Sequence, residues 1–195
     1  MNSTKDATVG LCALIQRAFC LETGQEFQIF LGQTGPISTD PRIRREFLSQ
    51  FGHEKLNSCL KSTGEFGVGS LSHTVNSLGD GVVLCCSLKC NNGFVSVGVD
   101  IEGRDRRIPI GIEKRVLSIQ EQALFQQIEF LDFWVLKEAA FKTKREGVIT
   151  DFQVTAFNCL EKSGPFEWRK AKINEMEGLV VHFGALTLGF AVLRK

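Results

Sequence analysis

The sequence lacks the features that mark several large protein classes. It has no low-complexity tract, no short internal repeat, and no apolar run near the roughly 20 residues needed to cross a bilayer. Lys plus Arg number 23 against 22 Asp plus Glu, so the net charge gives no reason to expect a polyanionic partner. Hydrophobic residues make up 43% of the chain, enough for a buried core. We therefore expect a soluble globular protein.

No Cys-x-x-Cys spacing occurs among the seven cysteines. Cys85 and Cys86 are adjacent, and in a strand their side chains point to opposite faces, so the pair cannot hold one metal ion. We interpret the cysteines as reduced thiols that pack as small apolar residues. The first ten residues are polar and lack the basic-then-apolar order of a signal peptide. A cytoplasmic location is the expectation.

Short elements are expected in the first half of the chain. Residues 9–21 read as a strand or a short helix, and residues 27–31 as a short strand. Pro41 is suited to open a helix that continues through Phe51, with Asp40 as its N-cap. The glycine-rich residues 64–69 lead into Ser72 and His73.

The middle of the chain reads as two strands. Residues 81–86 are short, apolar and β-branched, and residues 94–100 form a second run of the same kind. Asn91-Asn92-Gly93 lies between them as a turn signal. We expect the two strands to be antiparallel neighbours.

Helical spacing takes over after residue 110. Ser118 and Glu121 have the Ser-x-x-Glu form of a capping box, which predicts a helix start. A second helical run contains Leu131 and Ala140, and Gly147 is placed to stop it. Strands are expected at 152–157, 166–173, 178–183 and 186–193. The fold class expected from this pattern is α+β, with helices laid over antiparallel sheets.

Two acidic residues stand out at the end of an apolar strand. In Gly98-Val99-Asp100-Ile101-Glu102, the two carboxylates are two residues apart, so a strand points them to the same face. Like charges at this separation repel unless something neutralises them, and a divalent cation such as Mg²⁺ prefers such hard oxygen ligands. The alternative is a solvated strand end with two unrelated acids.

A row of polar residues and one tryptophan lies on the helix expected at 131–140 and on its extension to Lys142. Trp134, Glu138 and Lys142 are spaced by four, so a helix places them on one face. The alternative is an exposed Glu-to-Lys pair beside a core tryptophan, because this order of charges is favoured on helices.

Together the two segments resemble the signature of the 4′-phosphopantetheinyl transferase superfamily. Gly-Val-Asp-Ile-Glu is followed about 35 residues later by Trp-x-x-Lys-Glu-Ala-x-x-Lys. The linking stretch 113–121, the Leu71-Ser72-His73 segment with the strand after it, and residues 152–154 are also similar to that family. The resemblance covers roughly residues 70 to 160.

The resemblance implies a reaction and a role for each matching residue. A magnesium ion held by Asp100, Glu102 and Glu138 binds the pyrophosphate of coenzyme A, and the serine of a carrier protein attacks the β-phosphate. 3′,5′-Adenosine bisphosphate leaves. Glu138, or a water that it orients, is the candidate base. Lys142 matches the phosphate-binding lysine, and Ser72 with His73 the contacts to a coenzyme phosphate. Lys137 is a weaker candidate than Glu138 for direct contact with the substrate. We interpret His53 and His182 as structural or surface residues.

Three arginines follow the acidic pair. Arg104, Arg106 and Arg107 are either a solvated turn or a basic patch, extended by Lys114 and Arg115, that faces an acidic carrier helix or the coenzyme phosphates. The larger members of the family have a basic helix and a lysine before the Ser-His element. Arg42, Arg44 and Arg45 are the candidates for the basic helix here, and Lys55 or Lys61 for the lysine before Ser72.

The length of the chain favours the larger, two-half type of the family, which resembles the surfactin-synthetase activator. We expect a monomer with a degenerate N-terminal half at residues 1–91 and a C-terminal half at 92–195 that carries the metal site. Two alternatives stay open. One is a non-catalytic relative that binds coenzyme A or a carrier, and the other is a magnesium-dependent phosphohydrolase using the same acids.

Overall fold

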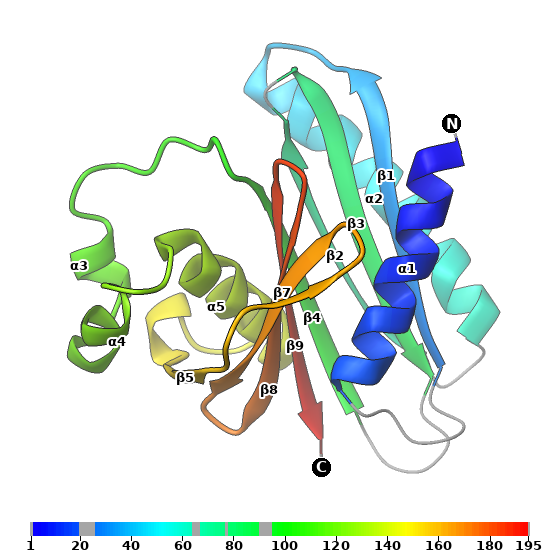
Figure 1. Ribbon diagram of the computed structural model, residues 1–195. Helices are drawn as coiled ribbons and strands as arrows, with labels where there is room; N and C mark the ends of the chain where they lie inside the picture. Colours follow the sequence, from blue (N-terminus) through cyan, green and yellow to red (C-terminus); the bar gives the residue numbers. More distant parts are fainter. Residues whose placement is uncertain (1, 20–25, 64–66, 77, 90–94, 195) are drawn as a thin grey trace.

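The computed structural model describes residues 2–19, 26–63, 67–76, 78–89 and 95–194, and its helices and strands fall into two blocks along the chain (Figure 1). The first block contains α1 (Asn2–Ala18), β1 (Glu26–Pro36), α2 (Pro41–Thr63), β2 (Gly67–Val75) and β3 (Asp80–Lys89). The second contains β4 (Val95–Gly103), α3 (Glu113–Val116), α4 (Ile119–Leu124), α5 (Phe130–Lys144), the 3-10 turn η1 (Ile149–Asp151), β5 (Val154–Phe157), β6 (Glu161–Ser163), β7 (Phe166–Ile173), β8 (Met176–Phe183) and β9 (Leu186–Arg194).

The strands form two antiparallel sheets, which confirms the α+β class. The first sheet has the order β1-β3-β2, and the second has the order β4-β9-β8-β7-β5 with β6 paired to β7. The change from one sheet to the other falls between β3 and β4, where residues 90–94, including the expected turn at Asn91-Asn92-Gly93, lie outside the described residues. That the two halves are copies of one unit stays a prediction.

The layers follow from which side chains each sheet buries. Leu11 and Ile15 of α1 pack in one shared core with residues of both sheets, such as Leu84 of β3 and Val99 of β4. The outer face of the first sheet is covered by α2, and the outer face of the second by α5. Figure 1 shows α2 and α5 on opposite sides of the molecule.

Two local expectations were wrong. The strands β3 and β4 are not paired with each other, because β3 lies between β1 and β2 while β4 pairs with β9. The stop expected from Gly147 is provided earlier, since Arg145 adopts the left-handed conformation with φ 59° and caps α5 after Lys144. For the segment 9–21, read as a strand or a short helix, the helical alternative is confirmed through Ala18, while residues 20 and 21 lie outside the described residues.

Other expectations about local structure are confirmed. Asp40 Oδ1 accepts hydrogen bonds from the backbone N–H groups of Arg42 (2.7 Å) and Ile43 (3.4 Å) at the start of α2. Ser118 and Glu121 form the complete capping box of α4. Cys85 and Cys86 point to opposite faces of β3, and burial raises the pKa of the Cys85 thiol to about 12. Across the described ranges, no helix combines the length and apolarity required of a transmembrane span.

Two glycines let α5 lie close against the second sheet. A Cβ built on Gly98 of β4 lies 1.9 Å from the carbonyl oxygen of Ala139, and one on Gly189 of β9 lies 2.4 Å from that of Val135. Both neighbours are helix backbone, which cannot move aside as a side chain does. The close approach brings α5, and with it Lys142, beside β4.

Replacing Gly98 with alanine should therefore push α5 away from β4. We expect a loss of about 1–3 kcal/mol in the free energy of unfolding, the usual cost of overpacking. Urea denaturation followed by circular dichroism measures it. Gly98 does not have a positive φ, so a loss of stability in its variant comes from the clash and not from backbone strain. Equal stability of the Gly98 variant and the wild type would contradict the packing argument.

Candidate functional site

Asp100 lies at the seam between the two sheets with only 5% of its surface exposed. Its Oδ1 accepts a hydrogen bond from the Ser72 hydroxyl at 2.7 Å and one from Lys142 Nζ at 2.8 Å. Lys142 Nζ also donates to Ser72 Oγ at 3.0 Å. The second oxygen, Oδ2, is buried and accepts no hydrogen bond from the described residues. Three of the residues singled out in the sequence thus meet in direct contact.

Glu102 shares the face of Asp100, as the alternation of β4 predicts. Its Oε1 pairs with Arg106, and its Oε2 accepts a hydrogen bond from the Thr74 hydroxyl at 3.3 Å. The guanidinium carbon of Arg106 lies 5.3 Å from the centre of the Trp134 ring, where the electron-rich face attracts a cation. Arg106 therefore links the acidic strand end to the first turns of α5.

On α5, Trp134, Glu138 and Lys142 are only partly buried, whereas most of the residues between them are buried. Burial is the main cause that raises the pKa of Glu138 above its usual value, and the negative charge of Asp100 raises it further. The charges of Lys142 and Arg106 oppose the rise. Asp100, Lys142 and Arg106 are thus close enough to Glu138 for their charges to act on its carboxyl group.

His73 lies on the other side of β2 from Ser72, because neighbouring residues in a strand alternate. It shares that face with Leu71 and Val75, which pack toward α2. Burial lowers the pKa of His73, and the charges of Lys142 and Arg45 lower it further. His73 is thus near two cations, and one of them, Arg45, lines an open groove of α2 together with Pro41, Arg42, Glu46 and Ser49.

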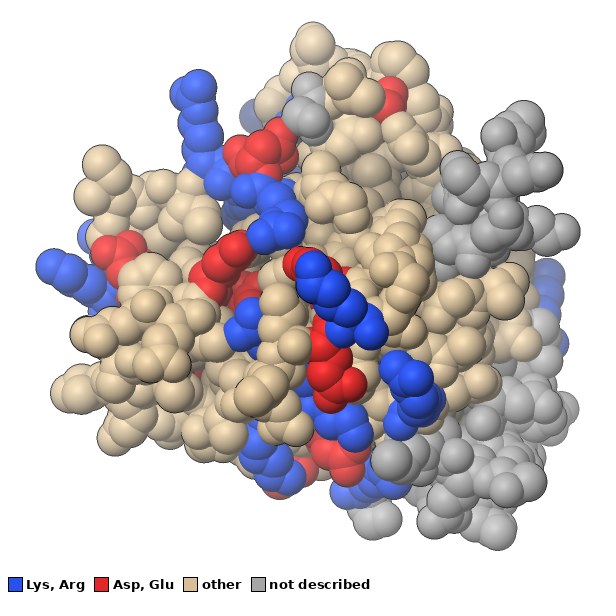
Figure 2. All heavy atoms as spheres, viewed as in Figure 1, with Lys and Arg blue, Asp and Glu red and all other residues tan. Residues whose placement is uncertain are grey.

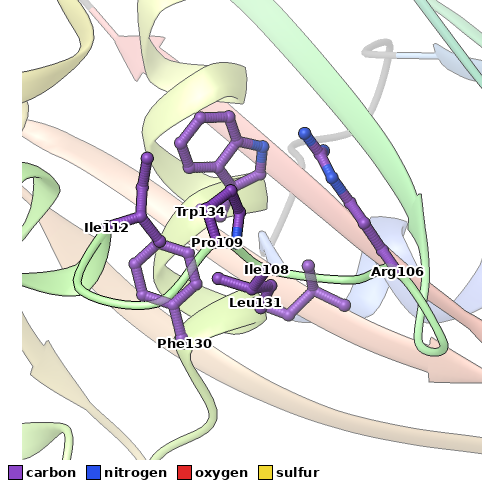
Figure 3. Close-up of a pocket in the computed structure, with 7 residues that line it drawn as sticks. All are labelled: Arg106, Ile108, Pro109, Ile112, Phe130, Leu131 and Trp134. Carbon is purple, nitrogen blue, oxygen red and sulfur yellow. The ribbon is translucent and has the colours of Figure 1, made fainter.

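An apolar pocket adjoins the acidic strand end (Figure 3). It has a volume of about 380 Å³ with its mouth included and is lined by Arg106, Ile108, Pro109, Ile112, Phe130, Leu131 and Trp134. Figure 3 shows the rings of Trp134 and Phe130 along one wall and Arg106 on the opposite side. Arg106 lines this pocket and also pairs with Glu102, so the pocket lies beside the acidic strand end.

The basic residues after Glu102 are spread over several partners. Arg104 pairs with Glu129 at 2.9 Å, Arg106 pairs with Glu102, and Arg107 is exposed. Lys114 and Arg115 are also exposed. In the view of Figure 2, acidic and basic side chains are interspersed in a band over the middle of the molecule, in line with the nearly balanced charge.

The donor set of the three acids fits a hard divalent cation. All their donor atoms are carboxylate oxygens, and Asp100 Oδ2 is buried with no hydrogen bond from the described residues. The raised pKa of Glu138 reflects, beside burial, a repulsion that a cation would relieve. Within the ranges that the structure describes, no three His, Cys, Asp or Glu side chains are already gathered as a ligand cluster. The metal-ligand role of Asp100, Glu102 and Glu138 stays a prediction.

The structure also shows two buried pairs that the sequence did not reveal. Lys137 has no exposed surface and lies 2.9 Å from the Glu121 carboxylate, so it is part of the buried structure, whereas its neighbour Glu138 is only partly buried. His182 Nε2 lies 2.8 Å from Asp132 Oδ1, which gives that histidine a structural place. His53 is exposed on α2. The two partners lie 16 and 50 residues away in sequence, so no local pattern marked them.

Comparison with known proteins adds one finding. Residues 96–176 match the family model described as the 4′-phosphopantetheinyl transferase superfamily. The match covers less than half of the chain, and it includes both acids of β4, Glu138 and Lys142 but not Ser72 or His73. No curated protein matches the chain.

Proposed function

We propose that this chain transfers the 4′-phosphopantetheine arm of coenzyme A to a serine of an apo carrier protein and releases 3′,5′-adenosine bisphosphate. The family match at 96–176 supports phosphopantetheine transfer in general. The observation that carries the specific reaction is the contact of Asp100, Lys142 and Ser72 at the seam, with Glu138 beside them. Acids and a lysine at one point suit a cation and a phosphate together.

Asp100, Glu102 and Glu138 are the residues that would hold magnesium. The ion, when bound, supplies positive charge to the pyrophosphate of coenzyme A and so eases attack on the β-phosphate. The chain itself supplies fixed oxygens for this purpose. Asp100 is held by Ser72 and Lys142, and Glu102 by Thr74 and Arg106. Fixed ligands lose little entropy on binding.

Glu138 is the best candidate to accept the proton of the carrier serine. Its raised pKa brings the carboxylate nearer to the operating pH, where a general base is most effective. Lys142, which lies 2.8 Å from Asp100, stands where it can also bind a phosphate oxygen as a point charge. The two residues are one helical turn apart on α5 and therefore act from the same side.

The remaining parts of the substrates are assigned by charge. His73 and Arg45, near the open groove of α2, are suited to the phosphate at the adenosine end of coenzyme A. The exposed Arg107, Lys114 and Arg115 are suited to an acidic helix of the carrier. We expect the protein to act as a monomer in the cytoplasm.

Mass spectrometry of apo carrier proteins after incubation with coenzyme A and Mg²⁺ tests the proposal. A carrier that gains the mass of the arm on its serine, together with release of 3′,5′-adenosine bisphosphate, supports it. Binding of coenzyme A without transfer to any carrier of a broad panel would favour a non-catalytic relative. Hydrolysis of coenzyme A in the absence of any carrier would favour a phosphohydrolase.

Replacing Asp100 with alanine should change the magnesium dependence of the reaction. The variant loses the buried Oδ2 and the partner of Lys142, so we expect a higher Mg²⁺ concentration for half-maximal rate and a lower maximal rate. Transfer rates measured over a Mg²⁺ series check this. A variant that keeps the Mg²⁺ curve of the wild type would remove Asp100 from the set of ligands.

A further inference from the structure

Three hydroxyl side chains of β2 face the acidic strand β4 in a row. Ser70, Ser72 and Thr74 are two residues apart, so the strand points all three to the same side. Each reaches a different residue of β4 at Val99, Asp100 or Glu102. The partners advance in the same order along both strands, so β2 and β4 run side by side in the same direction.

The row lies where the two sheets meet without sharing a backbone ladder. In the sheet order of the described residues, β2 pairs only with β3 and β4 only with β9. Side-chain hydroxyls therefore join the first block of the chain to the strand that carries the acids. Ser70 and Ser72 are each 7% exposed, so these bonds are shielded from competing water.

The three members of the row differ in what they hold. Ser70 Oγ accepts the backbone N–H of Val99 at 3.1 Å, a bond that joins the strands but touches no carboxylate. The Ser72 hydroxyl donates to Asp100 Oδ1, and the Thr74 hydroxyl donates to Glu102 Oε2. The bonds of Ser72 and Thr74 thus fix the orientation of carboxylate groups, whereas the bond of Ser70 only joins the two strands.

We infer that Ser72 and Thr74 are positioning residues that orient the carboxylates of Asp100 and Glu102 for the cation and phosphate of the proposed transfer. The inference rests on that proposed function. A glutamate side chain has three rotatable bonds, so a fixed donor against one oxygen limits where the other can point. Hydrogen bonds of this kind commonly change metal affinity by about 10- to 100-fold when removed.

Thr74 provides the sharper test because it has no other assigned role. Thr74→Val keeps the shape of the side chain and removes the hydroxyl, whereas Thr74→Ser keeps the hydroxyl. We expect Thr74→Val to weaken Mn²⁺ binding about tenfold and Thr74→Ser to bind like the wild type. Electron paramagnetic resonance of free Mn²⁺, with coenzyme A present and the carrier absent, measures binding without turnover.

Ser72→Ala should weaken Mn²⁺ binding more than Thr74→Val, since its hydrogen bond to the carboxylate is 2.7 Å long against 3.3 Å for Thr74. Ser70→Ala is the matched control on the same seam. Ser70→Ala removes the acceptor of the buried Val99 N–H, so the melting temperature of this variant should fall. Its Mn²⁺ affinity should stay at the wild-type value.

The outcomes separate the inference from the function on which it rests. Wild-type Mn²⁺ affinity in Thr74→Val, or equal losses in the Ser70 and Thr74 variants, overturns the positioning role even if the wild type transfers the arm. The absence of Mn²⁺ binding by the wild type overturns it as well. Weaker Mn²⁺ binding in Thr74→Val with rescue by serine supports it, also where the carrier assay shows no transfer.

Discussion

Replacing Glu138 with glutamine should lower the rate of arm transfer by about a hundredfold or more and leave the protein at least as stable as the wild type. The rate falls because glutamine neither accepts the serine proton nor offers a charged ligand. The stability effect has the opposite sign. Since the pKa of Glu138 is raised in the folded protein, ionisation of this carboxyl opposes folding at neutral pH, and glutamine removes that cost.

The same raised pKa sets the pH dependence. As pH rises from the ordinary glutamate value through the raised pKa of Glu138, the folded state loses a proton that it binds more tightly than the unfolded chain, so this group lowers stability over that window. Transfer, which needs the carboxylate, should also fall at low pH, but at a lower pH than this window, because bound Mg²⁺ favours the ionised form of Glu138. In Glu138→Gln both effects should disappear.

Single-turnover transfer assays and thermal melts over a pH series check these expectations. Glu175→Gln is the matched control, because Glu175 is an exposed acid that pairs with Lys144 away from the seam, and its removal should leave transfer unchanged. If Glu138→Gln transfers the arm at the wild-type rate, Glu138 is neither the base nor a required ligand. A melting temperature well below that of the wild type would show that the charge stabilises the fold.

Replacing Lys137 with methionine should destabilise the protein by about 3–5 kcal/mol, the typical cost of breaking a buried ion pair. Lys137 Nζ also donates to the carbonyl oxygen of Phe152 at 2.6 Å. Its partner Glu121 accepts the backbone N–H groups of Ser118 and Val154, both at 2.7 Å. Without the lysine, the buried carboxyl of Glu121 has no cation beside it, and α4, α5 and β5 lose the group that joins them.

Urea denaturation of a double-mutant cycle measures this pair. Glu121→Gln keeps an acceptor oxygen for the backbone, so adding it to Lys137→Met should recover part of the lost stability by removing the unpaired charge. Lys162→Met removes an exposed cation paired with Glu167 and should have little effect on stability. A loss in Lys137→Met no larger than in Lys162→Met would contradict the role of the buried pair.

Lys137 and Glu138 show that adjacent residues of one sequence motif can have different places in the structure. They are adjacent in the sequence signature, yet a helix turns successive residues by about 100°, so one faces the interior and the other the seam. The sequence predicted that Trp134, Glu138 and Lys142 share a face. It did not predict that Lys137 would be fully buried, since its partner Glu121 comes from another helix.

The sequence by itself determined which residues share a face of a strand or a helix, because these follow from the two-residue repeat of a strand and the 3.6-residue turn of a helix. The alternation of β4 put Asp100 and Glu102 on one face, the capping box set the start of α4, and the spacing of four aligned the row of polar residues and one tryptophan on α5. These relations hold within a few residues, where covalent geometry leaves little choice.

Only the tertiary structure decided which segments meet. The pairing of β4 with β9, the hydroxyls of Ser72 and Thr74 against acids 28 residues away, and the close seat of α5 on Gly98 depend on how the two sheets pack. Such contacts follow from burying apolar faces against each other, and many partners can satisfy one apolar face. The acids, Ser72 and Lys142 were therefore predictable from the sequence, while their mutual contacts and the part of Thr74 were not.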